Sequence, residues 1–65
     1  MTLEEIKYLV ESEKTILAKT SQMITSVYIN TKYKNDPEIV KYLESLKVPI
    51  MYSDNEPEIF IGTNR

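Results

Sequence analysis

The chain has 65 residues, no cysteine and no histidine, and its formal net charge is −2. These numbers exclude disulfides, cysteine nucleophiles and histidine acid–base catalysis, and they leave almost no ligands for a zinc site. They also disfavour nucleic acid as the partner, because proteins bind it largely by neutralising its phosphates. We therefore expect one domain over residues 1–65, with no cofactor or metal, stabilised by regular packing and by self-association.

The N-terminal segment is predicted to form one long amphipathic helix over residues 3–31. Thr2 and Glu5 have the spacing of a capping box, which marks the first turn of a helix. Apolar residues then recur at a spacing of seven, which gives a continuous apolar stripe. A helix of this length is about 45 Å long, and the rest of the chain is too short to cover its stripe. We expect the stripe to join the chains of a homo-oligomer through Leu3, Ile6, Val10, Leu17, Ile24 and Val27.

Residues 25–33 also fit a strand, because they are rich in β-branched and aromatic types. Val27, Ile29, Thr31 and Tyr33 alternate with the period of a strand. The helix is favoured because the stripe runs through this segment without a glycine or proline. A strand here would shorten the helix and would weaken the argument for self-association.

A second helix is predicted over residues 37–47, with Asp36 as its cap and Pro37 in its first position. Pro49 ends it, and two alternating segments at 49–53 and 58–62 are predicted to form a β-hairpin around the turn-rich residues 53–57. The fold class that follows is α+β and mainly helical. It combines a long N-terminal helix, a short second helix and a C-terminal hairpin.

The function predicted from these features is binding. The chain lacks a constellation of catalytic residues, whereas tyrosines are enriched in protein interfaces and the acidic hairpin is expected to steer towards a basic partner. We expect a small non-enzymatic regulatory or inhibitory protein that self-associates and binds a protein partner. Tyr8 and Tyr33 are the expected exposed contacts within the partner-binding set, which consists of Tyr8, Tyr33, Tyr52, Asp54 and Glu56.

Two alternatives stay open at this point. Lysines interleaved with a tyrosine could bind a nucleotide or nucleic acid by charge and stacking, and the residues concerned are Lys32, Tyr33, Lys34 and Lys41. The chain could also be a structural subunit of a larger assembly.

The expected location is the cytoplasm. Apolar runs never exceed three residues, so neither a membrane span nor a signal peptide is expected. Seven lysines against one arginine, together with frequent Ile, Tyr and Asn, indicate AT-rich codons and a low-GC genome. We therefore expect a phage or a mobile element as the source, and the host cytoplasm as the location in that case.

Overall fold

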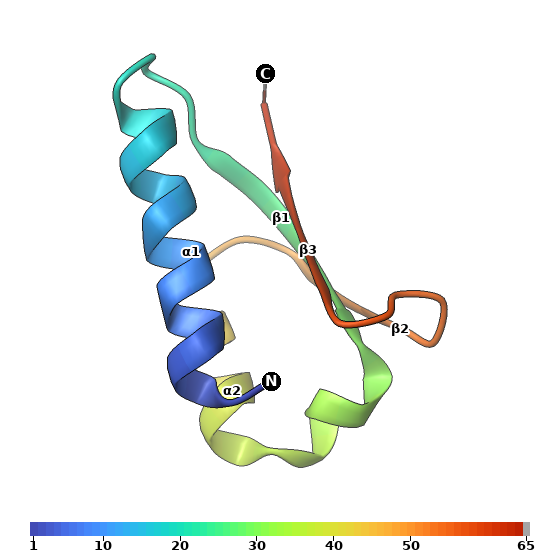
Figure 1. Cartoon of the computed structure of the whole chain (residues 1–65). Coiled ribbons are helices and arrows are strands. Elements are labelled where there is room, and N and C mark those ends of the chain that lie inside the picture. The colour runs from blue at the N-terminus through green and yellow to red at the C-terminus, as the bar shows by residue number, and fades with distance from the viewer. Residues whose placement is uncertain (65) are drawn as a thin grey trace.

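The computed structural model describes residues 1–64 and shows helices packed against a three-stranded sheet (Figure 1). The predicted α+β class is confirmed, with its long N-terminal helix, short second helix and C-terminal strands. The elements in chain order are α1 (Leu3–Ala18), β1 (Ile24–Asn30), the 3₁₀ helix η1 (Thr31–Asn35), α2 (Pro37–Glu44), β2 (Ile50–Ser53) and β3 (Ile59–Thr63).

Both α-helices begin at the caps that the sequence predicts. The Thr2 hydroxyl accepts a hydrogen bond from the Glu5 backbone N–H at 3.2 Å, and the Glu5 carboxylate accepts one from the Thr2 N–H at 2.8 Å. The hydrogen bond from the Thr2 backbone lowers the pKa of the Glu5 carboxyl below its ordinary value. Asp36 accepts two backbone N–H groups of the next turn, at 3.1 and 3.3 Å, with Pro37 in the first helical position. These caps satisfy donors that have no partner within their own helix.

The predicted continuation of the first helix to residue 31 is wrong, and the strand alternative describes this segment. α1 ends at Ala18, and the chain turns through Ser21, which has a left-handed backbone with φ 58°. Val27 and Ile29, two residues apart on β1, are both fully buried. A strand places residues i and i+2 on one face, whereas a helix places them on different faces. The seven-residue recurrence therefore crosses from a helix into a strand and does not mark one long helix.

The second helix is confirmed but is shorter than predicted. α2 ends at Glu44, three residues before the predicted end, and the backbone of Lys47 is left-handed with φ 59°. This reversal, followed by Pro49, directs the chain into β2.

The strands near the C-terminus are confirmed within one residue of their predicted bounds, but they do not form a hairpin. The strand order is β2-β1-β3, so β1 lies between them. β1 pairs in parallel with β2 and antiparallel with β3, and Val27 lies beside Ile50 on one side and Ile61 on the other. An isolated two-stranded hairpin is marginal in water, whereas a central strand lets both edges share one apolar face. Residues 54–58 need to cross only two strand spacings, about 10 Å.

Asn30 holds this crossing in place at the end of β1. Its backbone N–H donates to the Glu58 carbonyl at 2.9 Å, and its side-chain amide donates to the Glu56 carbonyl at 2.7 Å. Its side-chain oxygen accepts the Lys32 N–H at 2.8 Å and so caps η1. One short polar side chain therefore connects β1, η1 and the β2–β3 connection.

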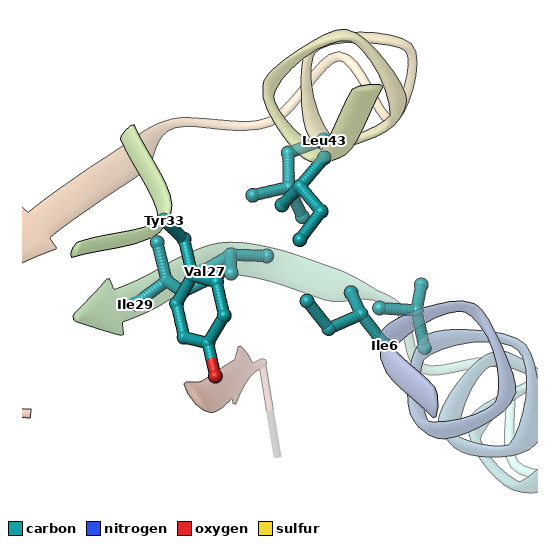
Figure 2. Packing of buried hydrophobic residues seen from close by; sticks show 7 residues of the cluster. Ile6, Val27, Ile29, Tyr33 and Leu43 are labelled. Carbon is teal, nitrogen blue, oxygen red and sulfur yellow. The ribbon is translucent and has the colours of Figure 1, made fainter. Parts of the chain in front are cut away.

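The hydrophobic core lies between the sheet and the helices. Figure 2 shows apolar side chains from α1, α2, β1 and η1 meeting over one face of β1. Each aliphatic side chain buried in this way contributes about 1.5–3 kcal/mol to folding. The buried members are Ile6, Val10, Val27, Ile29, Tyr33, Ile39 and Leu43.

Candidate interaction surface

The face of the sheet opposite the core carries a row of apolar side chains. Successive residues of a strand point to opposite faces, so Tyr28 projects away from its buried neighbours on β1. The register places Met51 of β2 on one side of Tyr28 and Phe60 of β3 on the other. We call this row, with the adjacent Ser26 and Gly62, the open sheet face.

The open sheet face is exposed although much of it is apolar. Tyr28 is 37% exposed and Phe60 is 56% exposed, and their ring centroids lie 6.1 Å apart with the rings tilted by 49°. The solvated face of an antiparallel sheet is ordinarily polar. Both described α-helices pack against the other face, although Leu9 and Ile16 of α1 are themselves exposed. An aromatic pair left in solvent on a chain this small is therefore a candidate contact surface.

A shallow hollow of about 600 Å³ lies at one end of the open sheet face. Gly62 lies in it opposite Ser26, and a Cβ at this glycine would come 2.4 Å from the Ser26 hydroxyl oxygen. Glycine thus keeps the hollow open and lets β1 and β3 pack closely. The hollow is lined by Thr25, Ser26, Tyr28, Phe60, Ile61, Gly62 and Thr63.

Tyr33 is not the exposed contact that the sequence suggests. It is 6% exposed, and its ring belongs to the core. Its hydroxyl accepts a hydrogen bond from the N-terminal ammonium of Met1 at 2.7 Å and donates one to the Glu58 carboxylate. Burial, followed by the hydrogen bond to Glu58, raises the pKa of Tyr33 to about 12. The pKa of Glu58 is lowered by its hydrogen bonds to Tyr33 and to Lys32, whose ammonium lies 3.0 Å away.

The apolar stripe that is predicted to join the chains of a homo-oligomer instead packs inside a single chain. Four of its members are fully buried by the chain's own helices and sheet, and the other two, Leu3 and Ile24, pack against the core. The shorter α1 removes the mismatch in length on which the prediction rested. The four buried members are Ile6, Val10, Leu17 and Val27.

The remaining partner-binding candidates do not form one surface with the open sheet face. Tyr8 is 73% exposed on α1. Tyr52 packs against the core, and burial raises its pKa. Asp54 is exposed and Glu56 is half-buried in the connection between β2 and β3, so the predicted acidic tip is a crossing segment and not a hairpin turn.

The lysines of the alternative ligand site point to different partners. Lys32 binds Glu58 at the start of β3, whereas the Lys34 ammonium lies 5.7 Å from the ring centre of Tyr52 on β2. β2 and β3 are the two edges of the sheet, so these lysines do not converge around a shared site. Lys41 is exposed on α2. The Lys32 ammonium does lie 5.2 Å from the ring centre of Tyr33, but that ring is buried, and the structure does not bring all four predicted ligand-binding residues together.

Sequence reasoning missed Tyr28, Met51 and Phe60, although the sequence carries a signal for them. Met51 and Phe60 each stand between two apolar residues in an alternating segment. When residues 24–30 form a strand, Tyr28 likewise stands between two apolar residues, Val27 and Ile29. What the sequence lacks is the register that places the three side by side.

Among residues 1–64, no group of three or more acidic side chains is arranged to hold a metal ion. No helix in this part of the chain is long and apolar enough to cross a membrane. The chain matches no protein-family model, and comparisons with curated proteins and with solved structures find no significant match.

Proposed function

We propose that the protein is a small, non-enzymatic regulatory or inhibitory protein that self-associates and binds a protein partner through the open sheet face. The observation that carries the proposal is the row of Tyr28, Met51 and Phe60 across all three strands, in which Tyr28 and Phe60 are exposed and Met51 is half-buried. Aromatic residues and methionine are enriched in protein interfaces because they offer large contact areas. A rigid sheet presents these side chains at low entropic cost.

The charge of the chain indicates the chemistry of the partner. The formal net charge is −2, and Asp54 and Glu56 lie in the connection between the two edge strands. These acidic groups are not part of the open sheet face, but negative charge steers a basic partner over a distance and contributes more to the rate of association than to affinity. The expected partner surface is an apolar patch with lysines or arginines beside it.

Binding is favoured over catalysis because of where the ionisable groups lie. Among the described residues no charged side chain is buried. Catalytic acids and bases work best in pockets that exclude water and shift their pKa values. The two tyrosines whose pKa values are raised to about 12 are already engaged within the fold, Tyr33 by Met1 and Glu58 and Tyr42 by Glu11.

Site-specific photo-crosslinking tests the proposal. A benzophenone-bearing phenylalanine is placed at Phe60 in one full-length variant and at Tyr8 in a matched control, since both side chains are aromatic and exposed. We expect a discrete adduct with another protein from position 60 and none from position 8. The adduct should persist at high salt and disappear when Tyr28→Ser is added.

Two outcomes would contradict the proposal. Equal crosslinking from both positions would show that the open sheet face is not selected by a partner. An adduct with nucleic acid that weakens steeply with salt, and that is lost with Lys32→Ala and Lys34→Ala, would favour the ligand-binding alternative.

A further inference from the structure

We propose that the free edge of β3 is the contact between two copies of this chain. The two β3 strands pair antiparallel about a two-fold axis at Ile61, and the two sheets join into one. This inference deepens the self-association in the proposed function and rests on that part of it. It moves the contact from the apolar stripe of α1 to the edge of the sheet.

β3 is an edge strand without the usual protection. It pairs with β1 on one side, and the strand order leaves its other side open. Natural edge strands are shielded by charged side chains, prolines or bulges that prevent pairing with another chain. The run Ile59–Thr63 contains no charged residue and no proline, and the irregularity in its pairing with β1 lies on β1, between Ile24 and Ser26, opposite Thr63 and Gly62.

The backbone of β3 presents a self-complementary row of donors and acceptors. The Asn30 N–H donates to the Glu58 carbonyl at 2.9 Å, so Glu58 faces β1. Residues of an antiparallel strand alternate between bonding to the neighbour and facing away from it. The N–H and C=O groups of Ile59, Ile61 and Thr63 therefore point out of the sheet edge.

One register between the two β3 strands pairs all of these outward-pointing N–H and C=O groups. With the axis at Ile61, this residue pairs with itself across the interface, and Ile59 pairs with Thr63 of the second copy. A shift by two residues in either direction leaves one end of the strand unpaired. The register with the most hydrogen bonds is thus fixed by the length of β3.

The side chains on the open sheet face fit the same register. Phe60 comes to lie directly opposite Gly62 of the second copy, in a pair without backbone hydrogen bonds, where side chains are closest. Gly62 lines the hollow beside β1, so there is room for the ring. An aromatic side chain covering a glycine on the neighbouring strand is a known stabilising arrangement in sheets.

Charge and burial on the remaining positions agree with this pairing. Ile59 and Ile61 are only half-buried because they lie at the sheet edge, and the second copy would cover them. Glu58 comes opposite Asn64 and not opposite its own equivalent, so no like charges meet. The contact is small for a specific interface, and dimerisation is expected to depend on concentration in the accessible range.

The first test uses the unmodified chain. Amide hydrogen exchange and backbone NMR shifts are followed across a hundredfold range of protein concentration, with the mass measured by light scattering. We expect a monomer–dimer transition in which the amides of Ile59, Ile61 and Thr63 become protected while the β2 amides stay unchanged. A monomer at every concentration would overturn the proposal, and so would a dimer that protects other amides.

The register is tested by single cysteines, since the chain has none of its own. Ile61→Cys should be linked between two copies by a short thiol-specific cross-linker, because self-paired residues across the two-fold have Cα atoms about 5.5 Å apart, and their Cβ atoms are too far apart for an unstrained disulfide. Met51→Cys on the other edge strand and Tyr8→Cys on α1 are matched controls that should remain mostly unlinked. Equal linkage of all three variants would overturn the register.

These results separate this proposal from the proposed function. A chain that stays monomeric but still gives a partner adduct from position 60 would retain partner binding and remove the β3 contact. A dimer with the predicted amide protection and no partner adduct would retain the β3 contact and remove partner binding through the open sheet face.

Discussion

The two faces of β1 differ sharply although their residues are neighbours in sequence. Val27 and Ile29 are fully buried under α1 and α2, whereas Tyr28 between them is 37% exposed beside Phe60. The apolar character of the two faces is similar, but only one is covered within the chain. Both α-helices of this small chain pack on one face of the sheet, which leaves Tyr28 and Phe60 on the other face exposed.

Under the proposed function, this difference divides stability and recognition between the two faces of a single strand. The core face contains aliphatic side chains that gain free energy by leaving water. The open sheet face contains aromatic and thioether side chains, which offer contact area while tolerating solvent. Truncating one side chain on each face tests whether the two faces differ as much in their contribution to the free energy of unfolding as they do in exposure.

The largest expected effect comes from truncating the core face. Ile29→Ala should lower the free energy of unfolding by about 2–5 kcal/mol, because a fully buried aliphatic side chain is replaced by a cavity. Small domains are stable by only about 5 kcal/mol, so this variant should keep only a small part of its stability and unfold at a much lower urea concentration. Urea denaturation followed by circular dichroism measures the change.

Tyr28→Ala is the matched control on the open sheet face. It should cost about 1 kcal/mol, since it removes an aromatic pair on a solvated surface and no core contact. If it destabilised the chain as much as Ile29→Ala does, the open sheet face would be a second structural face and not a contact surface.

Local features of this fold could be predicted from the sequence. The capping box of Thr2 and Glu5 and the cap at Asp36 are each read from residues a few positions apart, and both are confirmed. The strands β2 and β3 were found from alternation within short segments. These signals are strong because they depend on backbone groups and side chains of the same turn or strand.

The pairing of distant segments could not be predicted in this way. Residues 24–28 satisfy both a seven-residue and a two-residue period, and the turn at Ser21 has no glycine to mark it. The strand period prevails because β2 and β3 both hydrogen-bond to β1. That requirement arises from long-range contacts, which a local pattern does not contain.

The candidate site depended on the same missing information. The enrichment of tyrosine in interfaces predicts Tyr33 as an exposed contact, yet η1 turns its ring into the core while Lys32 and Lys34 remain outside. Tyr28 was assigned to a helix and so was not compared with Phe60. Both errors follow from one misplaced helix end.

The ionisable hydroxyl of Tyr33 should make the stability of the core depend on pH, and Tyr33→Phe removes this hydroxyl while keeping the ring. Its pKa is raised from 10.0 to about 12, so its contribution to stability is complete below pH 10 and is lost as the pH rises towards 12. The wild-type urea midpoint should therefore fall between pH 9 and pH 11.5, and it should fall less in Tyr33→Phe.

Tyr42→Phe serves as a control for this measurement. The pKa of Tyr42 is also raised to about 12, chiefly by burial, and its hydroxyl lies 3.2 Å from the Glu11 carboxylate. Each single variant should remove part of the alkaline loss and the double variant more of it. Identical pH profiles for the wild type and Tyr33→Phe would show that this hydroxyl is not held in the protonated form by the fold.

The smallest expected effect lies within the open sheet face, between Gly62 and Ser26. A methyl group at position 62 would lie 2.4 Å from the Ser26 hydroxyl oxygen but 3.5 and 3.7 Å from the Ser26 carbonyl oxygen and Cβ, which are ordinary contacts. Only the hydroxyl must move, at a cost of about 0.5–1.5 kcal/mol. Alanine also gains about 0.5–1 kcal/mol over glycine inside a strand because the unfolded chain loses less freedom on folding.

The cost of moving the Ser26 hydroxyl and the entropic gain of alanine oppose each other. Whether Gly62→Ala raises or lowers the free energy of unfolding therefore depends on the residue at position 26. Gly62→Ala should be neutral or destabilising in the wild type and stabilising by about 0.5 kcal/mol when Ser26→Ala has already removed the hydroxyl. Urea denaturation at low protein concentration, where the chain is monomeric, measures both. Equal effects in the two backgrounds would show that the Ser26 hydroxyl does not limit residue 62, and that the close packing of β1 and β3 has another cause.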